Sequence, residues 1–378
     1  MSRTIAFAFD RVMHYHRPTL RALEQRLEAE GVAFHLFSSF DAAGTVGRVA
    51  ERKPAVARHE FYSLHERKVG NFTLRMQRGL DEMVARVKPS VVVSMSHSGT
   101  PTEWLLQSRT HARGARMVAW QCGYEYNPGR LKDAVLKRFI PRFDYHLCYH
   151  SNARDYALRY GARPDQTLVM HNTIDERAIL AGDRSEARRT LEARHPALRG
   201  KRIVLYVGAV LEEKRLDDVF AALERIGRSD LIFLLVGDGP HLAALRDRHG
   251  HRSDWVATGQ VIEGVGPYFD AADLFVLPGT GGLAINEAMA HRLPVISSYA
   301  DGSADDLVRN GETGFRVETG DVAQIADRIQ RVLGDADTAQ GMGLKGEALI
   351  RGELSFQRFI DRVAEGILGQ VRMASLRD

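Results

Sequence analysis

LFVLPGTGGLAINEAMA, residues 274–290, is the stretch of this sequence that decides its fold class. Its first four residues form a continuous apolar run, which is typical of a strand covered on both faces in a parallel sheet. Pro278 and three glycines then end the strand, and a mostly apolar helical pattern follows at once. Strand–turn–helix steps of this kind build doubly wound α/β sheets, whose ligands bind beyond the carboxyl ends of the strands.

The same alternation of strand and helix patterns runs through all 378 residues. Strands are expected in the first half near Thr4–Phe9, Ala33–Ser38, Val91–Met95, Met117–Gln121, Tyr145–Tyr149 and Thr167–Met170. In the second half they are expected near Arg202–Val207, Leu231–Val236, Asp254–Ala257, Leu274–Leu277, Pro294–Ser297 and Gly314–Val317. Helical patterns between them include Thr19–Glu30, Leu216–Ile226 and Val322–Leu333. The predicted fold class is α/β, with two doubly wound Rossmann-like domains in tandem.

The domain boundaries are expected where the strand signal disappears. Residues 183–200, DRSEARRTLEARHPALRG, are strongly charged and contain no strand pattern. We therefore expect a first domain over residues 1–177, a linker over 178–200 and a second domain over 201–354. A final helical stretch over residues 355–378 is not needed to complete the second sheet, and we expect it to pack back on the first domain.

The composition excludes several classes of protein. With 44% hydrophobic residues, 26% charged residues and 2 cysteines, the chain is neither disordered, nor collagen-like, nor a disulfide scaffold. No apolar run approaches the ~18 residues of a membrane span, and the first ten residues lack a secretory apolar segment, so we expect a cytoplasmic protein. The net charge of +4 hides a partition: residues 1–180 carry 27 Lys and Arg against 18 Asp and Glu, and the remainder carries 25 against 30. This partition indicates that the two halves bind different partners, or it is a random variation in composition.

Two strand ends in the second half carry residues suited to a phosphate-bearing ligand. Lys214 follows the strand near Arg202–Val207 and the turn at Gly208, and its ammonium could reach a diphosphate. Gly281 and Gly282 leave the N-terminus of the next helix open to a phosphate, and Glu287 lies one turn further on. A carboxylate on such an apolar helix needs a hydrogen-bonding partner, which ribose hydroxyls would supply. A solvated lysine and a structural ion pair are the alternative interpretations.

Residues 208–333 resemble the C-terminal domain of glycosyltransferase family 4, also described as glycosyl transferases group 1. The blocks that carry the resemblance, in order, are VGAVLEEKRLDDVFAAL, LLVGDGP, ATGQV, VGPYFDAADLFVLPG, GLAINEAMAHRLPVISS and LVRNGETGFRVETGD. The segment 169–175, VMHNTID, is similar to the family's interdomain stretch. The resemblance implies the GT-B fold, in which two Rossmann-like domains face a central cleft, and a reaction that retains the anomeric configuration.

The resemblance also implies roles for individual residues. Glu287 would be the second glutamate of the family's E-x7-E motif and hold the ribose, and Lys214 would bind the diphosphate. The remaining donor-binding residues implied are Gly208, Gln260, Val261, Gly281, Gly282, Leu283, Ala284 and Asn172, with Gln260 and Val261 beside the base. Two positions depart from the family: Gly279 replaces the first glutamate of the motif, and Ala209 replaces an arginine. A different donor sugar, a repositioned cation such as Arg215 or lost activity could each follow.

In the first half, three strand ends carry candidate acceptor-binding residues. The loop after the first strand offers His14, Tyr15, His16 and Arg17, which could bind an acidic or hydroxyl-rich acceptor. His97 follows another strand and is a candidate catalytic residue that contacts the donor sugar or the acceptor. Tyr124 and Glu125 follow a third and could stack on a sugar and accept its hydroxyl protons. An ordinary polar surface loop is the alternative interpretation for each.

A basic amphipathic stretch, residues 130–140, leaves two interpretations open. Leu131, Val135 and Phe139 share one helical face beside several cations. The stretch could rest on an anionic membrane surface that carries a lipid-linked acceptor, or it could pack on its own sheet.

The function expected from the sequence is transfer of a sugar from a nucleotide-diphosphate sugar to an acceptor hydroxyl, in the synthesis of cell-surface polysaccharide or lipid-linked oligosaccharide. The expected partners are the donor and a saccharide or lipid-linked acceptor. No cofactor, metal ion or nucleic acid is expected, because metal-binding and nucleic-acid-binding motifs are missing from the sequence. The alternatives are a nucleotide-sugar epimerase of the same fold and a catalytically inactive nucleotide-sugar-binding subunit. The expected location is cytoplasmic, with contact to the inner face of the plasma membrane as an option.

Overall fold

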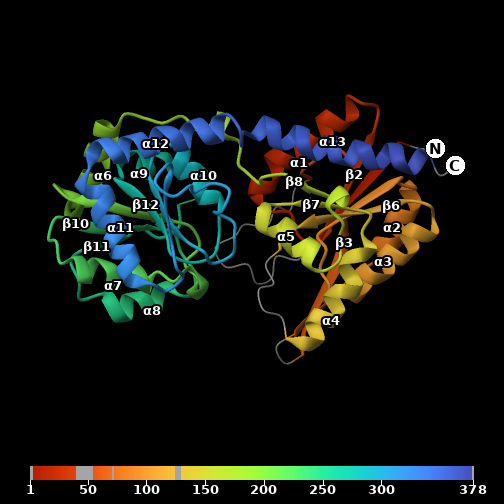
Figure 1. Ribbon diagram of the computed structural model, residues 1–378, viewed down its shortest axis with the longest axis horizontal. Helices are drawn as coiled ribbons and strands as arrows, with labels where there is room; N and C mark the ends of the chain where they lie inside the picture. The colour runs from red at the N-terminus through yellow and green to blue at the C-terminus, as the bar shows by residue number, and fades with distance from the viewer. Residues whose placement is uncertain (1–2, 40–53, 70–71, 124–128, 262, 377–378) are drawn as a thin grey trace. The chain divides into compact units, whose positions relative to one another are not determined.

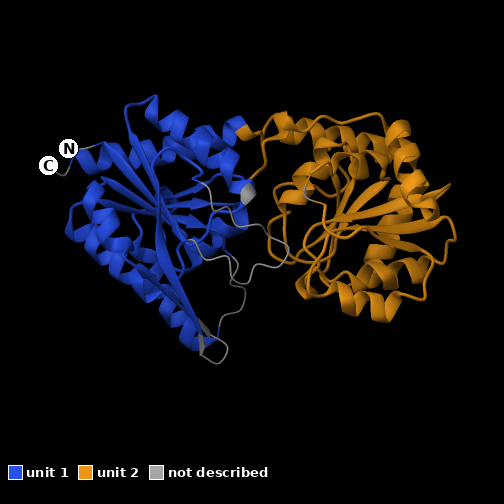
Figure 2. Cartoon of the chain, turned by 180° about the vertical axis from the view of Figure 1, so that it is seen from behind, with its two compact units in different colours: residues 1–45, 49–172, 357–378 blue, residues 46–48, 173–356 orange. Residues whose placement is uncertain are grey.

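The computed structural model describes residues 3–39, 54–69, 72–123, 129–261 and 263–376. They form two compact α/β units (Figures 1 and 2). Unit 1 contains the described residues up to Asn172 together with residues 357–376, and unit 2 contains those from Thr173 to Phe356. Of the helices in these ranges, none combines the length and the apolar composition that crossing a membrane requires.

Unit 1 is built on a sheet with the strand order β4-β3-β2-β1-β5-β6-β7-β8, parallel except for the β3–β4 hairpin. Its strands are β1 Thr4–Phe9, β2 Ala33–Ser39, β3 His59–Val69, β4 Phe72–Arg78, β5 Val91–Ser94, β6 Arg116–Gln121, β7 Tyr145–Cys148 and β8 Thr167–Val169. The helices are η1 His14–His16, α1 Arg17–Glu28, α2 Leu80–Val87, α3 Pro101–Ala112, α4 Arg130–Phe139, η2 Ile140–Arg142, α5 Ser151–Arg159 and η3 Pro164–Gln166. The six predicted strands are present, and the hairpin is an addition that the sequence analysis missed.

Unit 2 contains a fully parallel sheet with the order β11-β10-β9-β12-β13-β14. Its strands are β9 Arg202–Val207, β10 Leu231–Val236, β11 Trp255–Ala257, β12 Leu274–Leu277, β13 Val295–Ser298 and β14 Gly314–Val317. The helices are η4 Glu176–Ala178, α6 Arg184–Arg194, η5 Pro196–Leu198, η6 Glu212–Lys214, α7 Asp217–Ile226, α8 Leu242–His249, α9 Gly266–Ala271, α10 Leu283–Ala290, α11 Val322–Gly334 and α12 Ala336–Arg351. The apolar strand runs are buried, as expected for a sheet covered on both faces.

The segment predicted as a linker, residues 178–200, is instead part of unit 2. Leu191 of α6 and Leu198 of η5 are fully buried in the core of that unit. Two of the charged side chains that made the segment resemble a linker form ion pairs within unit 2. Arg184 and Arg188 bind the carboxylate of Asp273 at 2.9 and 2.6 Å. The prediction of a linker was therefore wrong.

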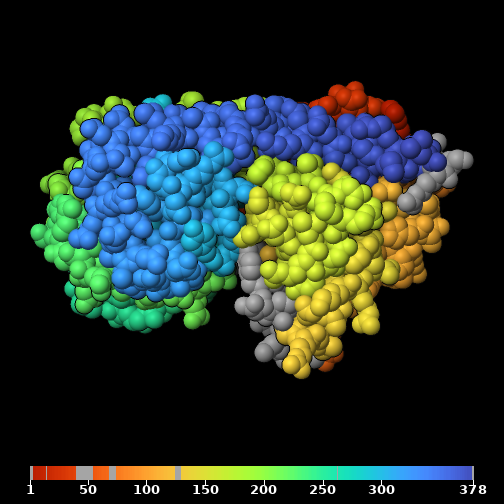
Figure 3. All heavy atoms as spheres, in the orientation of Figure 1, coloured from red at the N-terminus to blue at the C-terminus, as the bar shows by residue number. Residues whose placement is uncertain are grey.

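The C-terminal helix α13 (Phe356–Ser375) lies in unit 1 from residue 357 onward. Arg116 of β6 donates to Gln370 at 2.7 Å, and Phe359 packs edge-on against Trp120. Figure 3 shows this helix, in dark blue, at the surface of the unit. The helix therefore completes the unit whose sheet was formed by the first 170 residues of the chain.

Helix α4 packs on its own sheet. Leu136 and Phe139 are buried in the core of unit 1, whereas Leu131 is 75% exposed. The expected apolar face of Leu131, Val135 and Phe139 is therefore not a continuous exposed surface.

Candidate functional site

The site in unit 2 lies where the order of its strands reverses. β9 and β12 are neighbours, but the chain continues from β9 to β10 on one side and from β12 to β13 on the other. In a parallel sheet, the loops after two such strands diverge and leave room for a ligand at the carboxyl ends. These two loops carry Lys214 and the Gly279–Gly282 turn, so the two sequence-predicted motifs meet at the switch point of the sheet.

Lys214 is held against the loop that follows β12. The residue is only 8% exposed, and its Nζ donates to the carbonyl oxygen of Thr280 at 2.5 Å. The backbone N–H of Thr280 donates in return to the carbonyl oxygen of Glu213 at 3.1 Å. The two loops are thus tied together, and the ammonium group is fixed beside the Gly-rich turn.

A side chain at position 279 would collide with the turn that carries Lys214. A Cβ atom at this position would lie 2.1 Å from the carbonyl oxygen of Glu213 and 2.6 Å from the Cα of Lys214. The backbone of the Lys214 turn therefore occupies the space that a side chain at position 279 would need. The glycine at position 279 and the position of the Lys214 backbone therefore depend on each other.

The turn at Gly281 and Gly282 is braced by the loop after β13. The N–H of Gly281 donates to Asp301 Oδ2 at 2.7 Å, and the hydroxyl of Ser303 donates to the carbonyl oxygen of Gly281. Asp301 Oδ1 accepts from the backbone and the hydroxyl of Ser303 at 3.0 and 2.7 Å. The Gly281 amide is therefore engaged within the protein, and the contact of Gly281 with a donor stays a prediction.

The first turn of α10 still presents amides at this point. Gly282 is the residue before the helix, and Leu283 and Ala284 are its first two residues. Within the described ranges, no acceptor is recorded for the N–H groups of these three residues. Such N-terminal amides, together with the helix dipole, attract an anion. They remain candidates for a phosphate contact.

Glu287 lies one turn along α10 and is partly buried. Burial raises the pKa of this carboxyl group above its ordinary value, and His291 one turn further partly offsets the shift. No described side chain or backbone group donates a recorded hydrogen bond to the Glu287 carboxylate. Its buried neighbour Asn286 donates through its amide nitrogen to the hydroxyl of Thr173 at 3.0 Å. A half-buried acceptor that lacks donors from the protein is suited to the hydroxyl groups of a ligand.

The remaining predicted donor-binding residues occupy three different settings. Gly208 has φ +148°, and its loop packs closely against the loop after β10. A Cβ atom on Gly237 in that second loop would lie 1.9 Å from the carbonyl oxygen of Gly208, so the close packing requires a glycine at position 237. Gln260 is exposed and Val261 packs against the core of unit 2. Asn172 belongs to unit 1, where its backbone N–H donates to the carbonyl oxygen of Tyr149 at 2.8 Å. Their contacts with a donor stay predictions.

The predicted acceptor residues after β1 form the short helix η1 and the start of α1. His16 accepts a hydrogen bond from the backbone N–H of Met13 at 3.2 Å, and its ring packs edge-on against Tyr15. Arg17 is the first residue of α1. The side chain of His14, and Tyr124 and Glu125 altogether, lie outside the described residues.

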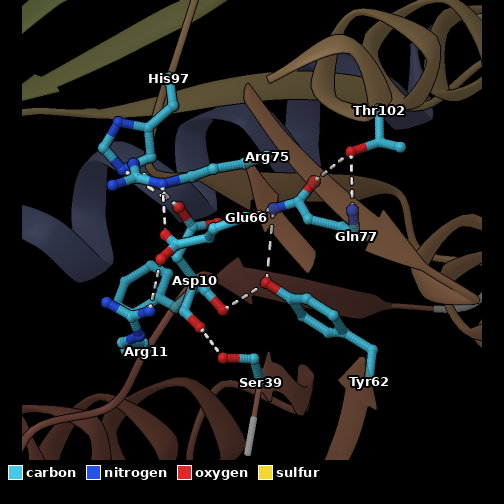
Figure 4. Close-up of polar contacts among 10 residues, drawn as sticks. Asp10, Arg11, Ser39, Tyr62, Glu66, Arg75, Gln77, His97 and Thr102 are labelled. Carbon is cyan, nitrogen blue, oxygen red and sulfur yellow. Dashed lines mark hydrogen bonds and ion pairs between the residues drawn. The ribbon is translucent and has the colours of Figure 1, made fainter. Parts of the chain in front are cut away.

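Unit 1 has its own switch point, between β1 and β5, and a polar cluster surrounds it (Figure 4). Asp10 follows β1 and His97 follows β5, with Asp10 Oδ2 3.5 Å from His97 Nε2. Arg75 of β4 lies 3.5 Å from the same oxygen. The sequence analysis selected His97 but not Asp10 or Arg75. Asp10 could have been predicted from the sequence, because it directly follows a strand. Arg75 could be predicted only by first recognising the β3–β4 hairpin.

In the part of the chain that the structure describes, no group of three or more His, Cys, Asp or Glu side chains could hold a metal ion. Both cysteines are unpaired thiols, and burial raises the pKa of Cys122 to about 12.

Residues 201–335 match the family model described as Glycosyl transferases group 1. N-acetyl-alpha-D-glucosaminyl L-malate synthase from Bacillus anthracis is 25% identical over 207 residues, 53% of this chain and 53% of that protein. Alpha-D-kanosaminyltransferase from Streptomyces kanamyceticus is 30% identical over 202 residues, 50% of this chain and 52% of that protein. The chain thus spans about half the length of the curated relatives it matches.

Solved structures match over nearly the whole chain. Anabaena HepE in complex with UDP-glucose has a TM-score of 0.72 at 15% identity, covering 97% of this chain and 99% of that chain. The chain has the GT-B fold. The predicted fold class of two Rossmann-like domains is confirmed, and the central cleft between them stays a prediction.

Proposed function

We propose that this protein is a glycosyltransferase that moves a sugar from a nucleotide-diphosphate sugar to an acceptor hydroxyl. The observation that carries the proposal is that the switch point of the unit 2 sheet has Lys214 on one loop and α10 on the other, with the first amides of this helix and with Glu287, which accepts no recorded hydrogen bond from the described residues. The match of residues 201–335 to the glycosyl transferases group 1 family supports it, as do the names of the relatives.

In this proposal, the diphosphate lies between Lys214 and the N-terminus of α10. An ammonium group has three N–H donors, so the bond from Lys214 to Thr280 is compatible with another to a phosphate oxygen. As the bond between sugar and diphosphate breaks, negative charge grows on the leaving group. A fixed cation and fixed amide dipoles stabilise that charge because they need no reorganisation. The proposal requires no metal ion or other cofactor.

Glu287 would hold the ribose. Two ribose hydroxyls would donate hydrogen bonds to the carboxylate. Burial raises the pKa of Glu287 and favours its protonated form, whereas these hydrogen bonds would favour the ionised form. Gln260 and Val261 are proposed to lie beside the base, and Gly208 to complete the donor site of unit 2. Asn172, in unit 1, is proposed separately as a donor contact. A thermal-shift screen of nucleotide-diphosphate sugars would identify the base and the sugar.

The acceptor is proposed to bind to unit 1, and the anomeric configuration to be retained, as the family resemblance implies. A saccharide or lipid-linked saccharide acceptor suits the cell-surface pathways in which such enzymes act. Leu131, exposed on α4 beside Arg130 and Lys132, is the proposed point of contact with the anionic inner face of the plasma membrane. The protein would thus be cytoplasmic and peripheral.

Thermal shift with a panel of nucleotide-diphosphate sugars tests the donor site. A donor at 100 times its Kd stabilises the folded protein by about 2.7 kcal/mol. For a unit of this size, that corresponds to a rise in Tm of about 5–10 °C. Glu287→Gln removes a hydrogen bond to a charged group, worth about 1.5–3 kcal/mol, and should weaken donor binding by about 10- to 150-fold. Glu224→Gln is the matched control, because the Glu224 side chain is 75% exposed in the same unit.

Nucleotide release then tests transfer. Release that depends on an added acceptor supports the proposal, and NMR of the product reports whether the configuration is retained. A donor that binds without release by any acceptor would identify an inactive binding subunit. Conversion of the donor to an isomer without an acceptor would identify an epimerase. Equal donor affinity in Glu287→Gln and Glu224→Gln would reject the ribose assignment.

A further inference from the structure

Asp10 is the buried centre of the polar cluster in unit 1. The residue is 8% exposed, and its Oδ1 accepts a hydrogen bond from Gln77 at 2.8 Å. Its carbonyl oxygen accepts from the hydroxyl of Ser39 at 2.6 Å. Oδ2 is buried and has no hydrogen-bond partner among the described residues, but two cationic or ionisable side chains, His97 and Arg75, each lie 3.5 Å away (Figure 4).

Gln77 fixes the carboxylate from the other side. Its amide nitrogen also donates to the hydroxyl of Tyr62 at 3.3 Å, and its amide oxygen accepts from Thr102 at 3.1 Å. Tyr62 donates to the carbonyl oxygen of Phe9, the residue before Asp10. Bonds from the hairpin and from α3 therefore determine which oxygen of Asp10 is turned toward His97.

The backbone that carries His97 is held in an uncommon conformation. Ser96 has φ +53°, in the left-handed region that non-glycine residues seldom adopt, at a cost of about 1–3 kcal/mol. The carboxyl group of Glu103, in the first turn of α3, lies near the backbone N–H groups of Ser96 and His97, which act to lower its pKa against the effect of burial. Glu103 is fully buried and also hydrogen-bonds to Ser94. This loop is thus fixed from beneath, and the direction of the His97 side chain is set by the fold.

His97 and Arg75 are the members of the cluster that a ligand can reach. Their side chains are 37% and 31% exposed, whereas that of Asp10 is 12% exposed. His97 follows the carboxyl end of β5, one of the two strands at the switch point, where ligands of such sheets bind, and Arg75 reaches the same carboxylate from the middle of the edge strand β4. The two side chains share one buried carboxylate oxygen, so Asp10 fixes both at once.

We propose that His97 and Arg75 bind the acceptor hydroxyl in unit 1, and that Asp10 is the positioning residue that fixes both side chains. This inference rests on the proposed transfer of a sugar to an acceptor. The negative charge of Asp10, 3.5 Å from His97 Nε2, favours a proton on that ring nitrogen and so influences what the ring offers a substrate.

The charges of the cluster select the class of acceptor. Arg75 is bound to Glu66 at 2.8 Å and Arg11 to the same carboxylate at 3.0 Å. The carboxylates of Asp10 and Glu66 therefore balance the guanidinium groups of Arg11 and Arg75. With a neutral His97, the cluster has no net positive charge that would attract an anion. The cluster suits a neutral, hydroxyl-rich acceptor such as a sugar or a cyclitol, rather than a phosphate or carboxylate.

The experiment compares His97→Gln and Asp10→Asn with His111→Gln. His111 is a matched control, because it is 36% exposed and bound to Asp144 at 3.0 Å in the same unit, but at the C-terminal end of α3. Steady-state nucleotide release is measured against acceptor concentration, using the donor and acceptor found in the screen. Removing a group that orients a site residue commonly costs about 10- to 100-fold. We expect His97→Gln and Asp10→Asn to lose at least tenfold in kcat/KM for the acceptor, and His111→Gln to stay within twofold.

Donor-induced thermal shift separates this inference from the function on which it rests. We expect the shift in both variants to equal that of the wild type, because neither Asp10 nor His97 is among the donor contacts in the proposed function. Wild-type acceptor kinetics in His97→Gln, with donor binding intact, would overturn the acceptor site and leave the transferase function standing. Full kinetics in Asp10→Asn with a loss in His97→Gln would overturn the positioning role. Failure of any nucleotide sugar to bind the wild type would overturn both proposals.

A pair of acceptors tests the ligand class. The acceptor found in the screen and its phosphorylated counterpart are compared at equal concentration. A higher kcat/KM for the neutral compound supports the charge argument, and a preference for the phosphorylated compound overturns it.

Discussion

Replacing Gly279 by alanine would place a methyl group inside the turn that carries Lys214. The new Cβ would lie 2.1 Å from the carbonyl oxygen of Glu213 and 2.5 Å from the carbonyl carbon of Lys214. Both obstacles are backbone atoms, which cannot move aside by changing a rotamer. The turn is also fixed by the bond from Thr280 to Glu213 and by the bond from Lys214 to Thr280. The two loops must therefore separate.

The magnitude follows from this rigidity. Overpacking usually costs about 1–3 kcal/mol, and a clash between two tied loops belongs at the upper end, about 3 kcal/mol. A unit of this size loses about 2–4 °C per kcal/mol, so we expect the Tm of unit 2 to fall by about 6–12 °C. Separation of the loops also moves Lys214 away from the N-terminus of α10, so donor affinity should fall at least tenfold.

Differential scanning calorimetry and donor titration measure the two effects. Gly341→Ala, in helix α12 of the same unit, is the matched control, because a Cβ there meets no atom within 4 Å. Alanine favours a helix by about 1 kcal/mol over glycine, so the control should keep or raise the Tm. A fall of less than 2 °C in Gly279→Ala would refute the claim that the Lys214 turn excludes a side chain at position 279.

Three further predictions test other parts of the structure. Lys214→Met keeps most of the buried volume but removes the cation, so we expect the Kd of the donor, measured by titration calorimetry, to rise at least tenfold; an unchanged Kd would place the diphosphate elsewhere. Burial raises the pKa of Glu103 to about 8, so the folded state holds a proton that the unfolded state releases above about pH 4.5. The free energy of unfolding should therefore fall as pH rises from 4.5 to 8, by up to about 1.4 kcal/mol per pH unit, and urea titrations of Glu103→Gln should show a weaker dependence. Leu191→Ala should destabilise unit 2 by about 2–5 kcal/mol in urea unfolding, whereas a change below about 0.5 kcal/mol would restore the prediction of a linker at 178–200.

The strands were predictable because their sequences are continuous apolar runs. The runs in β9, β10 and β12 contain four to six such residues each, and burial on both faces of a parallel sheet requires that composition. Lys214 and Glu287 were selected for a related reason, since each follows a strand end and a glycine turn within a few residues.

The hairpin β3–β4 and helix α6 were missed because their stability depends on distant partners. In β3, Tyr62 and Leu64 are buried whereas Ser63, His65 and the charged residues Glu66 and Arg67 are exposed, so only alternate residues signal a sheet. The charges of α6 resemble those of a solvated segment until Asp273, about 85 residues further on, binds two of them. Local patterns contain no information about such partners.

The sequence by itself determined the two α/β units, most of their strands and the two strand ends that carry Lys214 and Glu287, because these features depend on neighbours within one turn of chain. Only the tertiary structure decided that the Lys214 turn occupies the space beside Gly279, that Asp301 engages the Gly281 amide and that Asp10 faces His97 and Arg75. Each of these contacts joins residues between 20 and about 90 positions apart. Such residues become neighbours only when the order of the strands in each sheet places their loops side by side.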